Sequence, residues 1–445
     1  MMNANEISIG GSSTLVSRNS ERLDAVYAKV MWRIVPFLFL TFVMAWIDRV
    51  NVGFTKLQMN ESLAFSETVY GLGAGIFFIG YLLFEIPSNL ALERFGARKT
   101  ISRIAVGWGL CSIGLAFVTT PTQFYVLRFI LGACEAGLWP GIVLYVTYWF
   151  PTSRRSKAFA LIGCGSSMSG IIGGPLAGFL MVRMDGVQNW EGWQWVFFLE
   201  GVPSVLLGIA AIWALTDRPH QAHWLSAEER ELLAADLAKD ASASGKREHS
   251  FFQSLKNKTV WLYIAIYFCI IMGQSTLIFW APSMLKEVGI TSPATIGYII
   301  SGVFLVGIIA VIVNGIHSDR AKEINKHCGL AVLVASLGCA LLGYFLMLGS
   351  QWVILAMCIA LPGILCSIPV FWQLPNRVLV GTAAAAGIAM INSIGNLSGF
   401  FAPVVLGTVK DATGQIYHVV WAVAVILAIG GTLTLLAKRP SRENA

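Results

Sequence analysis

Long apolar runs recur along this chain, and they constrain its fold more than any other feature of the sequence. A helix that crosses a lipid bilayer needs about 20 predominantly apolar residues. Of the 445 residues, 56% are hydrophobic and only 12% are charged, whereas a soluble globular chain carries about 25% charged residues. The sequence therefore predicts an all-α membrane protein with twelve transmembrane helices. The runs cover residues 33–53, 69–92, 99–119, 123–149, 157–183, 194–216, 258–281, 294–317, 328–349, 351–374, 380–408 and 416–437.

One long polar segment, residues 217–257, divides these runs into two groups of six. Within it, Ser226 and Glu229 have the spacing of a capping box, so we expect a short surface helix through Leu237. Residues 241–247 have the composition of a flexible linker. We predict a polar N-terminal tail at 1–30, a six-helix bundle at 31–216, a linker at 217–257, a second six-helix bundle at 258–437 and a short tail at 438–445.

Basic residues are distributed unevenly between the loops on the two sides of the predicted membrane. Only Lys56, Arg183, Lys286 and Lys410 fall on one side, and the other side holds most of the remaining Lys and Arg. Because cytoplasmic loops carry an excess of Lys and Arg, we expect both termini and the linker to be cytoplasmic. The predicted location is the cell inner (plasma) membrane, crossed many times. The net charge of +7 comes from these loops. We do not expect nucleic-acid binding, because the sequence lacks a basic surface interleaved with aromatic residues.

The two halves of the chain share features at nearly one offset. Glu93-Arg94 follows the second run and Asp319-Arg320 follows the eighth, 226 residues later (319 minus 93). Pro175 and Pro403 lie in the fifth and eleventh runs, 228 residues apart (403 minus 175). Duplicated halves around a site at the membrane midplane are typical of transporters.

Away from the ends of the apolar runs, acidic and strongly basic residues occur only in the N-terminal half. An Asp or Arg at the centre of a bilayer costs about 2.5–3.5 kcal/mol on insertion scales, and such residues are usually functional. The C-terminal runs offer neutral hydrogen-bonding and aromatic groups in their place. The ionisable residues are Asp48, Arg49, Glu85, Arg128, Glu135 and Glu200, and the neutral ones are Gln274, Trp280, Trp372, Gln373, Asn392, Ser393 and Asn396.

Arg128 and Glu135 are seven residues apart, so two helical turns place them on one face. A buried Arg offers a planar fork to a carboxylate, and a buried carboxyl group can bind and release a proton near neutral pH. Asp48 and Glu135 are therefore candidate proton carriers, and Arg49 and Arg128 are candidate anion ligands. The alternative is that Asp48–Arg49 and Arg128–Glu135 are structural ion pairs. We interpret Glu85 and Glu200 as structural.

Two acid–Arg loops and several short segments carry a family resemblance. The loops at 89–99 and 315–320 resemble the cytoplasmic loop motif of the major facilitator superfamily, although Asn89 and Glu93 depart from it and the second copy lacks the following Gly-Arg. From about residue 30 to residue 437 the chain resembles the anion:cation symporter family, which includes permeases for tartrate, phthalate, 4-hydroxyphenylacetate and sugar acids. The segments that carry this closer resemblance are Ile47–Asn51, Glu85–Asn89, Gly96–Arg98, Glu135–Gly137 and Phe371–Pro375.

The resemblance implies roles for single residues. It implies protonation at Asp48 and Glu135, anion binding or coupling at Arg49 and Arg128, and substrate contacts at Tyr81, Trp372 and Asn392, each of which competes with a packing role. Trp46 and Ser166 stand where sugar-acid members have Tyr and Gln, so we expect a smaller or more aromatic acid than a hexonate. We expect Glu93, Arg94, Asp319 and Arg320 to form gating contacts, and Gly173-Gly174-Pro175 to be a site of close helix packing at a hinge.

Together these features predict a proton-coupled secondary transporter that takes up a small organic carboxylate by alternating access in two six-helix bundles. The alternative is an exporter or antiporter of organic anions or drugs. We expect no enzyme, no catalytic residue, no cofactor and no metal site, because no nucleophile–base pair, phosphate-binding loop or metal-ligand spacing is visible. The expected partners are a small organic anion, protons and membrane lipid, and the protein is expected to be monomeric.

Overall fold

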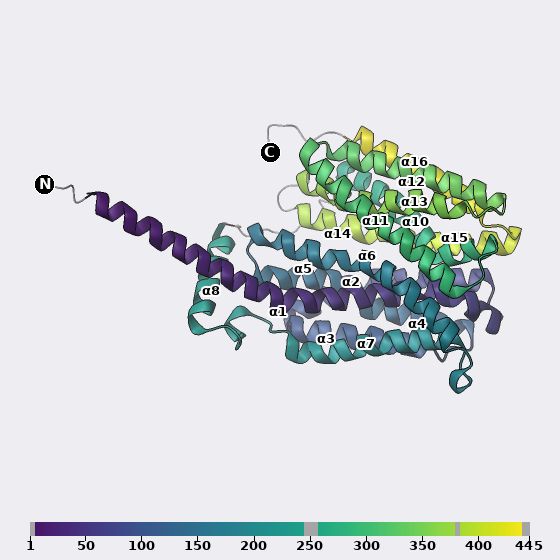
Figure 1. The fold of residues 1–445 in the computed structure, drawn as a ribbon, viewed down its shortest axis with the longest axis horizontal. Coiled ribbons are helices and arrows are strands. Elements are labelled where there is room, and N and C mark those ends of the chain that lie inside the picture. The colour runs from purple at the N-terminus through teal and green to yellow at the C-terminus, as the bar shows by residue number, and fades with distance from the viewer. Residues whose placement is uncertain (1–4, 244–256, 379–382, 438–445) are drawn as a thin grey trace.

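The computed structural model describes residues 5–243, 257–378 and 383–437, and within these ranges the chain forms helices and no strand (Figure 1). The helices of the N-terminal half are α1 (Asn5–Ser62), α2 (Glu67–Phe95), α3 (Ala97–Leu115), α4 (Pro121–Glu135), α5 (Leu138–Trp149), α6 (Thr152–Arg183) and α7 (Gly192–Ala214). The linker carries α8 (Ala227–Ala243). The C-terminal half contains α10 (Lys258–Glu287), α11 (Pro293–Ala321), α12 (Ile324–Met347), α13 (Val353–Val378), α14 (Ala383–Asn396), α15 (Ser398–Thr413) and α16 (Tyr417–Leu436).

Eleven helical segments in the described residues are long and apolar enough to cross a membrane. In this number α4 and α5 together form one segment, and α14 and α15 together form another. The helix that completes the predicted set is α3, whose first turns carry Arg98, Lys99 and Arg103 and therefore lower its apolar character. The prediction of an all-α membrane protein with two six-helix bundles is confirmed.

The first helix is much longer than the sequence predicted. We expected a polar tail over 1–30 and a membrane span over 33–53, but α1 is continuous from Asn5 to Ser62. Its N-terminal part projects from the bundle in Figure 1. At its other end the extension places Lys56, which we had assigned to a loop, inside the helix and buries it.

The linker forms the surface helix that its capping box predicted. Ser226 Oγ accepts the Glu229 N–H at 3.1 Å, and Glu229 Oε2 accepts the Ser226 N–H at 2.8 Å. The helix continues to Ala243, beyond the predicted end at Leu237. Tyr27 donates to Asp236 at 2.6 Å and Lys29 contacts Glu229 at 3.0 Å, so α8 is docked on α1. Residues 1–4 and 438–445 of the predicted tails, and 244–247 of the predicted flexible linker, lie outside the described residues.

A break between α4 and α5 interrupts the fourth predicted span. Ala136 leaves the helical conformation and Gly137 has φ of +84°, a left-handed value that glycine adopts without strain. A Cβ at Gly137 would lie 2.5 Å from Ser88 Oγ of α2. The break therefore places Glu135 at the end of α4 while the chain passes close to α2.

The two halves meet most closely at the end of the molecule that carries Glu67, which we call the Glu67 face. The opposite end carries α8 and is called the α8 face. Across the boundary α2 packs against α15, and α6 packs against α11. A Cβ at Gly174 would lie 2.7 Å from Gly297 O, and a Cβ at Gly297 would lie 2.2 Å from Gly174 O. Two glycines thus allow α6 and α11 to touch through their backbones.

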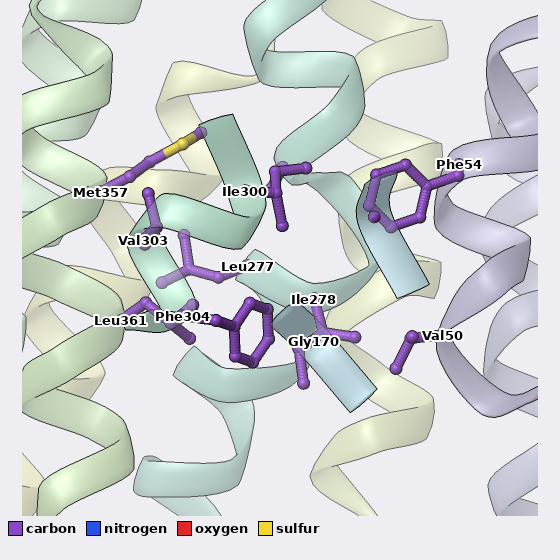
Figure 2. A pocket seen from close by; sticks show the side chains of 12 residues that line it. Val50, Phe54, Gly170, Leu277, Ile278, Ile300, Val303, Phe304, Met357 and Leu361 are labelled. Atoms are coloured by element: carbon purple, nitrogen blue, oxygen red, sulfur yellow. The ribbon is translucent and has the colours of Figure 1, made fainter. Parts of the chain in front are cut away.

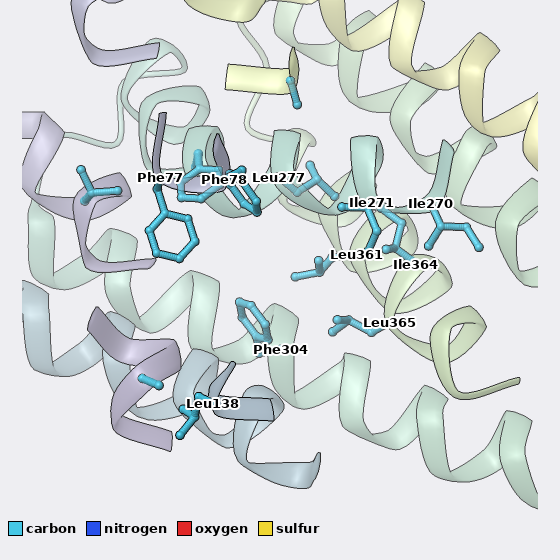
Figure 3. Packing of buried hydrophobic residues seen from close by; sticks show 14 of the residues in the cluster. Phe77, Phe78, Leu138, Ile270, Ile271, Leu277, Phe304, Leu361, Ile364 and Leu365 are labelled. Atoms are coloured by element: carbon cyan, nitrogen blue, oxygen red, sulfur yellow. The ribbon is translucent and has the colours of Figure 1, made fainter. Parts of the chain in front are cut away.

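An apolar core continues from one half into the other. Figure 3 shows Phe77 and Phe78 of α2 on one side, and Leu277 of α10, Phe304 of α11 and Leu361 of α13 on the other. All of these side chains are buried. Charged residues near this boundary are therefore surrounded by apolar groups.

Candidate functional site

Arg49 lies in an aromatic cage beside the boundary between the two halves. Its Cζ is 4.7 Å from the centre of the Trp46 ring, 5.1 Å from that of Phe77 and 5.4 Å from that of Tyr81. Its Nη2 donates to Glu135 Oε1, which forms an ion pair between α1 and α4. Arg49 Nε and Glu135 Oε2 are buried and have no hydrogen-bond partner among the described residues. The pair therefore retains unused donor and acceptor capacity.

Arg128 is completely buried next to this pair. It donates from Nε to Gly73 O at 3.2 Å and from Nη2 to Ala74 O at 3.4 Å, so it fastens α4 to the backbone of α2. Its Cζ is 5.2 Å from the centre of the Phe77 ring, so Phe77 contacts both arginines. Its Nη1 has no partner among the described residues. The predicted Arg128–Glu135 ion pair is absent from the described ion pairs, since Glu135 is bound to Arg49.

Asp48 faces away from Arg49 into the interior of the N-terminal half. Its carboxylate accepts hydrogen bonds from Trp108 Nε1 at 3.0 Å, Ser112 Oγ at 2.7 Å and Ser204 Oγ at 2.5 Å. Successive residues on an α-helix point about 100° apart, which explains why neighbours in sequence have different surroundings. The alternative of a structural Asp48–Arg49 pair is therefore wrong for this conformation.

Glu85 joins the two halves through hydrogen bonds. Its carboxylate accepts from Asn392 Nδ2 at 3.1 Å and from Ser393 Oγ at 2.9 Å, both on α14. Tyr81 lies one turn earlier on α2 and contacts Arg49, so Arg49, Tyr81 and the Glu85–Asn392 hydrogen bond lie along neighbouring turns of α2. The sequence favours a structural role for Glu85, and hydrogen bonds that join two helices agree with that interpretation. Its position one helical turn from Tyr81 was the signal that placed it beside the predicted site.

Two further predicted substrate contacts, Trp372 and Ser166, lie on other helices. Trp372 is half-buried on α13, with its ring centre 5.0 Å from that of Tyr267 of α10. Ser166 lies on α6, where its hydroxyl donates to Gly163 O at 3.0 Å. The structure brings Trp46, Tyr81, Arg49 and Glu135 into one cluster, whereas the hydroxyl of Ser166 is engaged by its own helix.

A small apolar cavity lies between the halves, near this cluster. Figure 2 shows Val50 and Phe54 of α1 on one side and Leu277, Phe304 and Met357 of the C-terminal half on the other. Its volume is about 30 Å³, which is enough for about two waters but too small for an organic acid. Apolar packing between the halves therefore reaches Val50, the neighbour of Arg49, whereas the Arg49 side chain itself is 17% exposed.

The Glu67 face is closed by a network of ion pairs that the sequence did not predict. Lys56 Nζ is 2.6 Å from Glu67 Oε2, and Lys410 Nζ is 3.1 Å from Glu67 Oε1 and 2.9 Å from Glu287 Oε1. Lys56 Nζ also lies 3.5 Å from the centre of the Trp280 ring. The pairs surround a cavity of about 420 Å³. In the sequence analysis, Lys56 and Lys410 contributed only to the predicted membrane orientation. In the structure they take part in contacts between the two halves.

Asp411 strengthens the same closure by capping a helix of the other half. Its carboxylate accepts the N–H groups of Glu67 at 3.1 Å and Thr68 at 2.7 Å. These groups belong to the first turn of α2, where backbone N–H groups lack partners within the helix. Capping across the boundary stabilises contact between α2 and α15.

The predicted gating residues lie at the α8 face. Glu93 and Arg94 are exposed near the end of α2, and Asp319 and Arg320 are exposed near the end of α11. None of the four forms an ion pair within the part of the chain that the structure describes. Arg94 lies 5.4 Å from the centre of the Phe95 ring. Their gating role stays a prediction.

Two six-helix bundles with buried cations and acids at their boundary define a class of protein, a polytopic membrane transporter. The family model described as Major Facilitator Superfamily matches residues 37–403. The chain belongs to this superfamily, and its closer relatives agree with the predicted anion:cation symporter family.

Relatives cover nearly the whole chain. A Pseudomonas putida protein named "Putative metabolite transport protein NicT" is 41% identical, over 98% of this chain and 100% of its own. An Agrobacterium vitis protein named "Putative tartrate transporter" is 42% identical, over 96% of this chain and 98% of its own. An Acinetobacter baumannii "Quinolone resistance transporter" is 36% identical, over 92% and 94%. The crystal structure of a D-xylose-proton symporter has the same fold, with a TM-score of 0.73, 14% identity and coverage of 92% and 98%.

Proposed function

We propose that this protein takes up a small organic carboxylate, either a tartrate-like hydroxy acid or an aromatic acid, together with protons. The observation that carries the proposal is the ion pair of Arg49 with Glu135 inside an aromatic cage. Arg49 is the cation of the site, and the aromatic rings provide surfaces for the apolar part of a substrate. The name of the Agrobacterium vitis relative supports tartrate as a representative of this class.

Exchange of partners at Arg49 couples the proton to the substrate. Ionised Glu135 holds Arg49, and a proton on Glu135 releases the guanidinium, whose fork then binds the carboxylate of the substrate. A buried charge left without its partner costs about 3–5 kcal/mol. Glu135 therefore loses its proton only when the anion has gone, and the anion binds only when the proton has arrived.

The remaining site residues complete the proposal. Arg128, whose Nη1 has no partner among the described residues, adds positive potential to the site. Asp48 is a second proton carrier, and it acts from inside the N-terminal bundle. We assign substrate contacts also to Trp46, Tyr81 and Trp372, and to Ser166 and Asn392 once the halves have moved apart.

Alternating access follows from the two ends of the molecule. The Glu67 face is the extracellular side, and its ion pairs break when the site opens outward. Glu93, Arg94, Asp319 and Arg320 then form contacts that close the α8 face, where both termini lie in the cytoplasm. The boundary between the halves thus has two alternative sets of contacts, one at each end, as a two-state transition requires.

The charge balance sets a lower limit on the protons that move. A charge that moves down a membrane potential releases about 2.3 kcal/mol per 100 mV. The potential drives uptake of a monoanion only when the transported complex is positive, which needs at least two protons. Uptake that left both the membrane potential and the internal pH unchanged would contradict the coupling.

The test uses purified protein in proteoliposomes, with L-tartrate, phthalate, 4-hydroxyphenylacetate and galactonate as probes. A thermal-shift panel first identifies the acid that stabilises the protein, and uptake is then measured with an imposed proton gradient. We expect accumulation of tartrate or an aromatic acid, with alkalinisation of the external medium. A galactonate signal stronger than those of the other three acids would overturn the substrate class.

A second candidate is an exporter or antiporter of organic anions or drugs. One observation favours it, the name of the Acinetobacter baumannii relative. The two functions differ in the direction of driven transport. In everted vesicles, an exporter accumulates a fluoroquinolone when the lumen is acidified, whereas a carboxylate symporter does not.

A further inference from the structure

A second buried carboxyl group, that of Glu200 on α7, lies close to Asp48 of α1, about one helical turn farther along the contact between the two helices. Glu200 of α7 is completely buried, and its Oε2 accepts the Asn51 Nδ2–H at 3.1 Å. Asn51 follows Asp48 by three residues on α1, and Ser204, which binds Asp48, follows Glu200 by four residues on α7. The pairs Asp48–Ser204 and Asn51–Glu200 are therefore successive contacts between α1 and α7, and the two acids are diagonal neighbours within them.

Neither acid has a cation within ion-pair distance among the described residues. The nearby cations are already bound, since Arg49 pairs with Glu135 of α4 and Lys56 pairs with Glu67 of α2. From α3 the groups that face Asp48 are Trp108 and Ser112, which are both uncharged, and the further charge that acts on Asp48 is Glu135 of α4, an acid already paired with Arg49. Two adjacent carboxylates in an apolar interior with no cation repel each other and lack solvation.

The hydrogen bonds distinguish the two acids. Asp48 accepts three hydrogen bonds, which is enough to support a carboxylate anion. Glu200 accepts one, and its Oε1 is buried without a partner among the described residues. An ionised carboxylate offers about four acceptor positions, so the surroundings of Glu200 fit a neutral acid better than an anion.

We propose that Asp48 and Glu200 form one proton-holding pair, in which Glu200 is the positioning partner that keeps a proton next to Asp48. This inference rests on the proposed proton coupling at Asp48 and extends it to a residue of α7. Before proton uptake the pair consists of one acid and one carboxylate. Uptake of one proton from water converts it to two acids, and its release restores the first state. No group is oxidised or reduced.

The first test follows the protons without any substrate. Infrared difference spectra of purified protein in lipid, recorded from acid to alkaline pH, report the C=O bands of protonated carboxyl groups. We expect Glu200→Gln to remove one such band and Asp48→Asn to move the band that remains for Glu200. The control Glu231→Gln changes an exposed acid on α8 and should leave these bands in place. Bands unaffected by Glu200→Gln would overturn the proposal.

The second test asks whether Glu200 acts on Asp48 during transport, with L-tartrate as the probe. We expect the alkaline limb of the uptake profile to move to lower pH by about one unit in Glu200→Gln, the size of shift that defines coupled titration. Counterflow, which needs no net proton movement, should be retained. If Glu200→Gln removed an infrared band but left the pH profile of uptake unchanged, Glu200 would hold a permanent proton without acting on Asp48. That result would reject the pair.

A conservative variant separates this role from a role in folding. Glu200→Asp keeps the acid, so we expect a shifted carboxyl band and a profile close to that of the unmodified protein. If Glu200→Gln does not fold, the spectra of Glu200→Asp provide the test. A carboxyl band that is unchanged in Glu200→Asp would rule the pair out. If no probe is transported, the proposed function fails, but the spectra still support or reject the pair.

Discussion

At the scale of the residue, two neighbours in sequence have separate tasks because the helix turns them apart. Arg49 faces the boundary between the bundles, where Glu135 and three aromatic rings hold it. Asp48 faces α3 and α7 and is held by hydrogen bonds from uncharged groups. One acid, Glu135, is thus paired with a cation, whereas Asp48 is surrounded by uncharged hydrogen-bond donors.

We expect Asp48→Asn and Arg49→Ala to fail in different ways. Asp48→Asn removes a proton carrier, so proton-driven accumulation of L-tartrate should be lost while counterflow remains. The amide also places an N–H₂ group where hydroxyl and indole groups donate, at a cost of about 1–3 kcal/mol in stability. Arg49→Ala removes the anion ligand, so binding itself should weaken, as measured by calorimetry on purified protein.

Arg49→Lys is the matched control for this comparison. It keeps the charge that pairs with Glu135 but loses the planar fork, so we expect weakened binding with a smaller loss of stability than for Arg49→Ala. If Asp48→Asn and Arg49→Ala both merely prevented folding, their functional roles would be refuted and a structural role would remain.

At the scale of the element, the sequence predicted the helices better than their contacts. Apolar runs located the spans because lipid demands them, and Ser226 with Glu229 located α8 because a capping box is local. The full length of α1 was missed because its first part is polar, contains the helix-weakening pair Gly10-Gly11 and has no apolar pattern to follow. The partners of Lys56, Glu85 and Asp48 depend on how distant helices pack, which no local pattern encodes.

Close packing of α6 and α11 should be sensitive to one methyl group. A Cβ at Gly297 would lie 2.2 Å from Gly174 O, which belongs to backbone that cannot rotate away. We expect Gly297→Ala to destabilise this closed state by about 1–3 kcal/mol and to reduce uptake. The control is Gly302→Ala on the same helix, where a Cβ has open space. Equal melting temperatures for the two variants would show that the halves are loosely packed here.

Docking of α8 on α1 should weaken in acid. The Ser226 backbone N–H, and then Lys29, hold the pKa of Glu229 below its ordinary value. A lowered pKa stabilises the docked helix above the unfolded pKa of about 4.3, and this stabilisation is lost as the pH falls through the folded value. We expect smaller protection factors for the α8 amides in acid, where the observed rates are compared with the slower intrinsic exchange at that pH, and faster exchange in Glu229→Gln already at neutral pH. Exposed Glu231→Gln is the control, and equal exchange rates in both variants would contradict the capping role.

At the scale of the whole molecule, one end of the boundary is closed by charge and the other carries exposed charges. Lys410 and Asp411 of α15 reach Glu67 and the first turn of α2, and these contacts cross from one half to the other. Exposed Arg94 and Arg320 lie at the opposite end. A transporter that alternates must exchange one closure for the other, so contacts that hold this state set the rate at which it opens.

Removing the charges that bridge the Glu67 face should therefore open it. In Lys410→Ala/Asp411→Ala, Glu67 loses a cation and the N–H groups of Glu67 and Thr68 lose the Asp411 carboxylate, whereas Lys56 still pairs with Glu67 and Ser66 still caps α2. Spin labels at Glu61 and Lys286, whose side chains lie 3.7 Å apart on opposite halves, report the change. Because the labels replace this ion pair, the labelled protein with Lys410 and Asp411 intact is the reference. We expect a new population at longer distance, and slower uptake because closure at this face becomes harder. The control is Lys326→Ala at the α8 face, whose ion pair with Glu323 lies within one half. A distance distribution that stays the same in the double variant would mean that backbone contacts such as Gly174–Gly297 hold the face closed without the ion pairs.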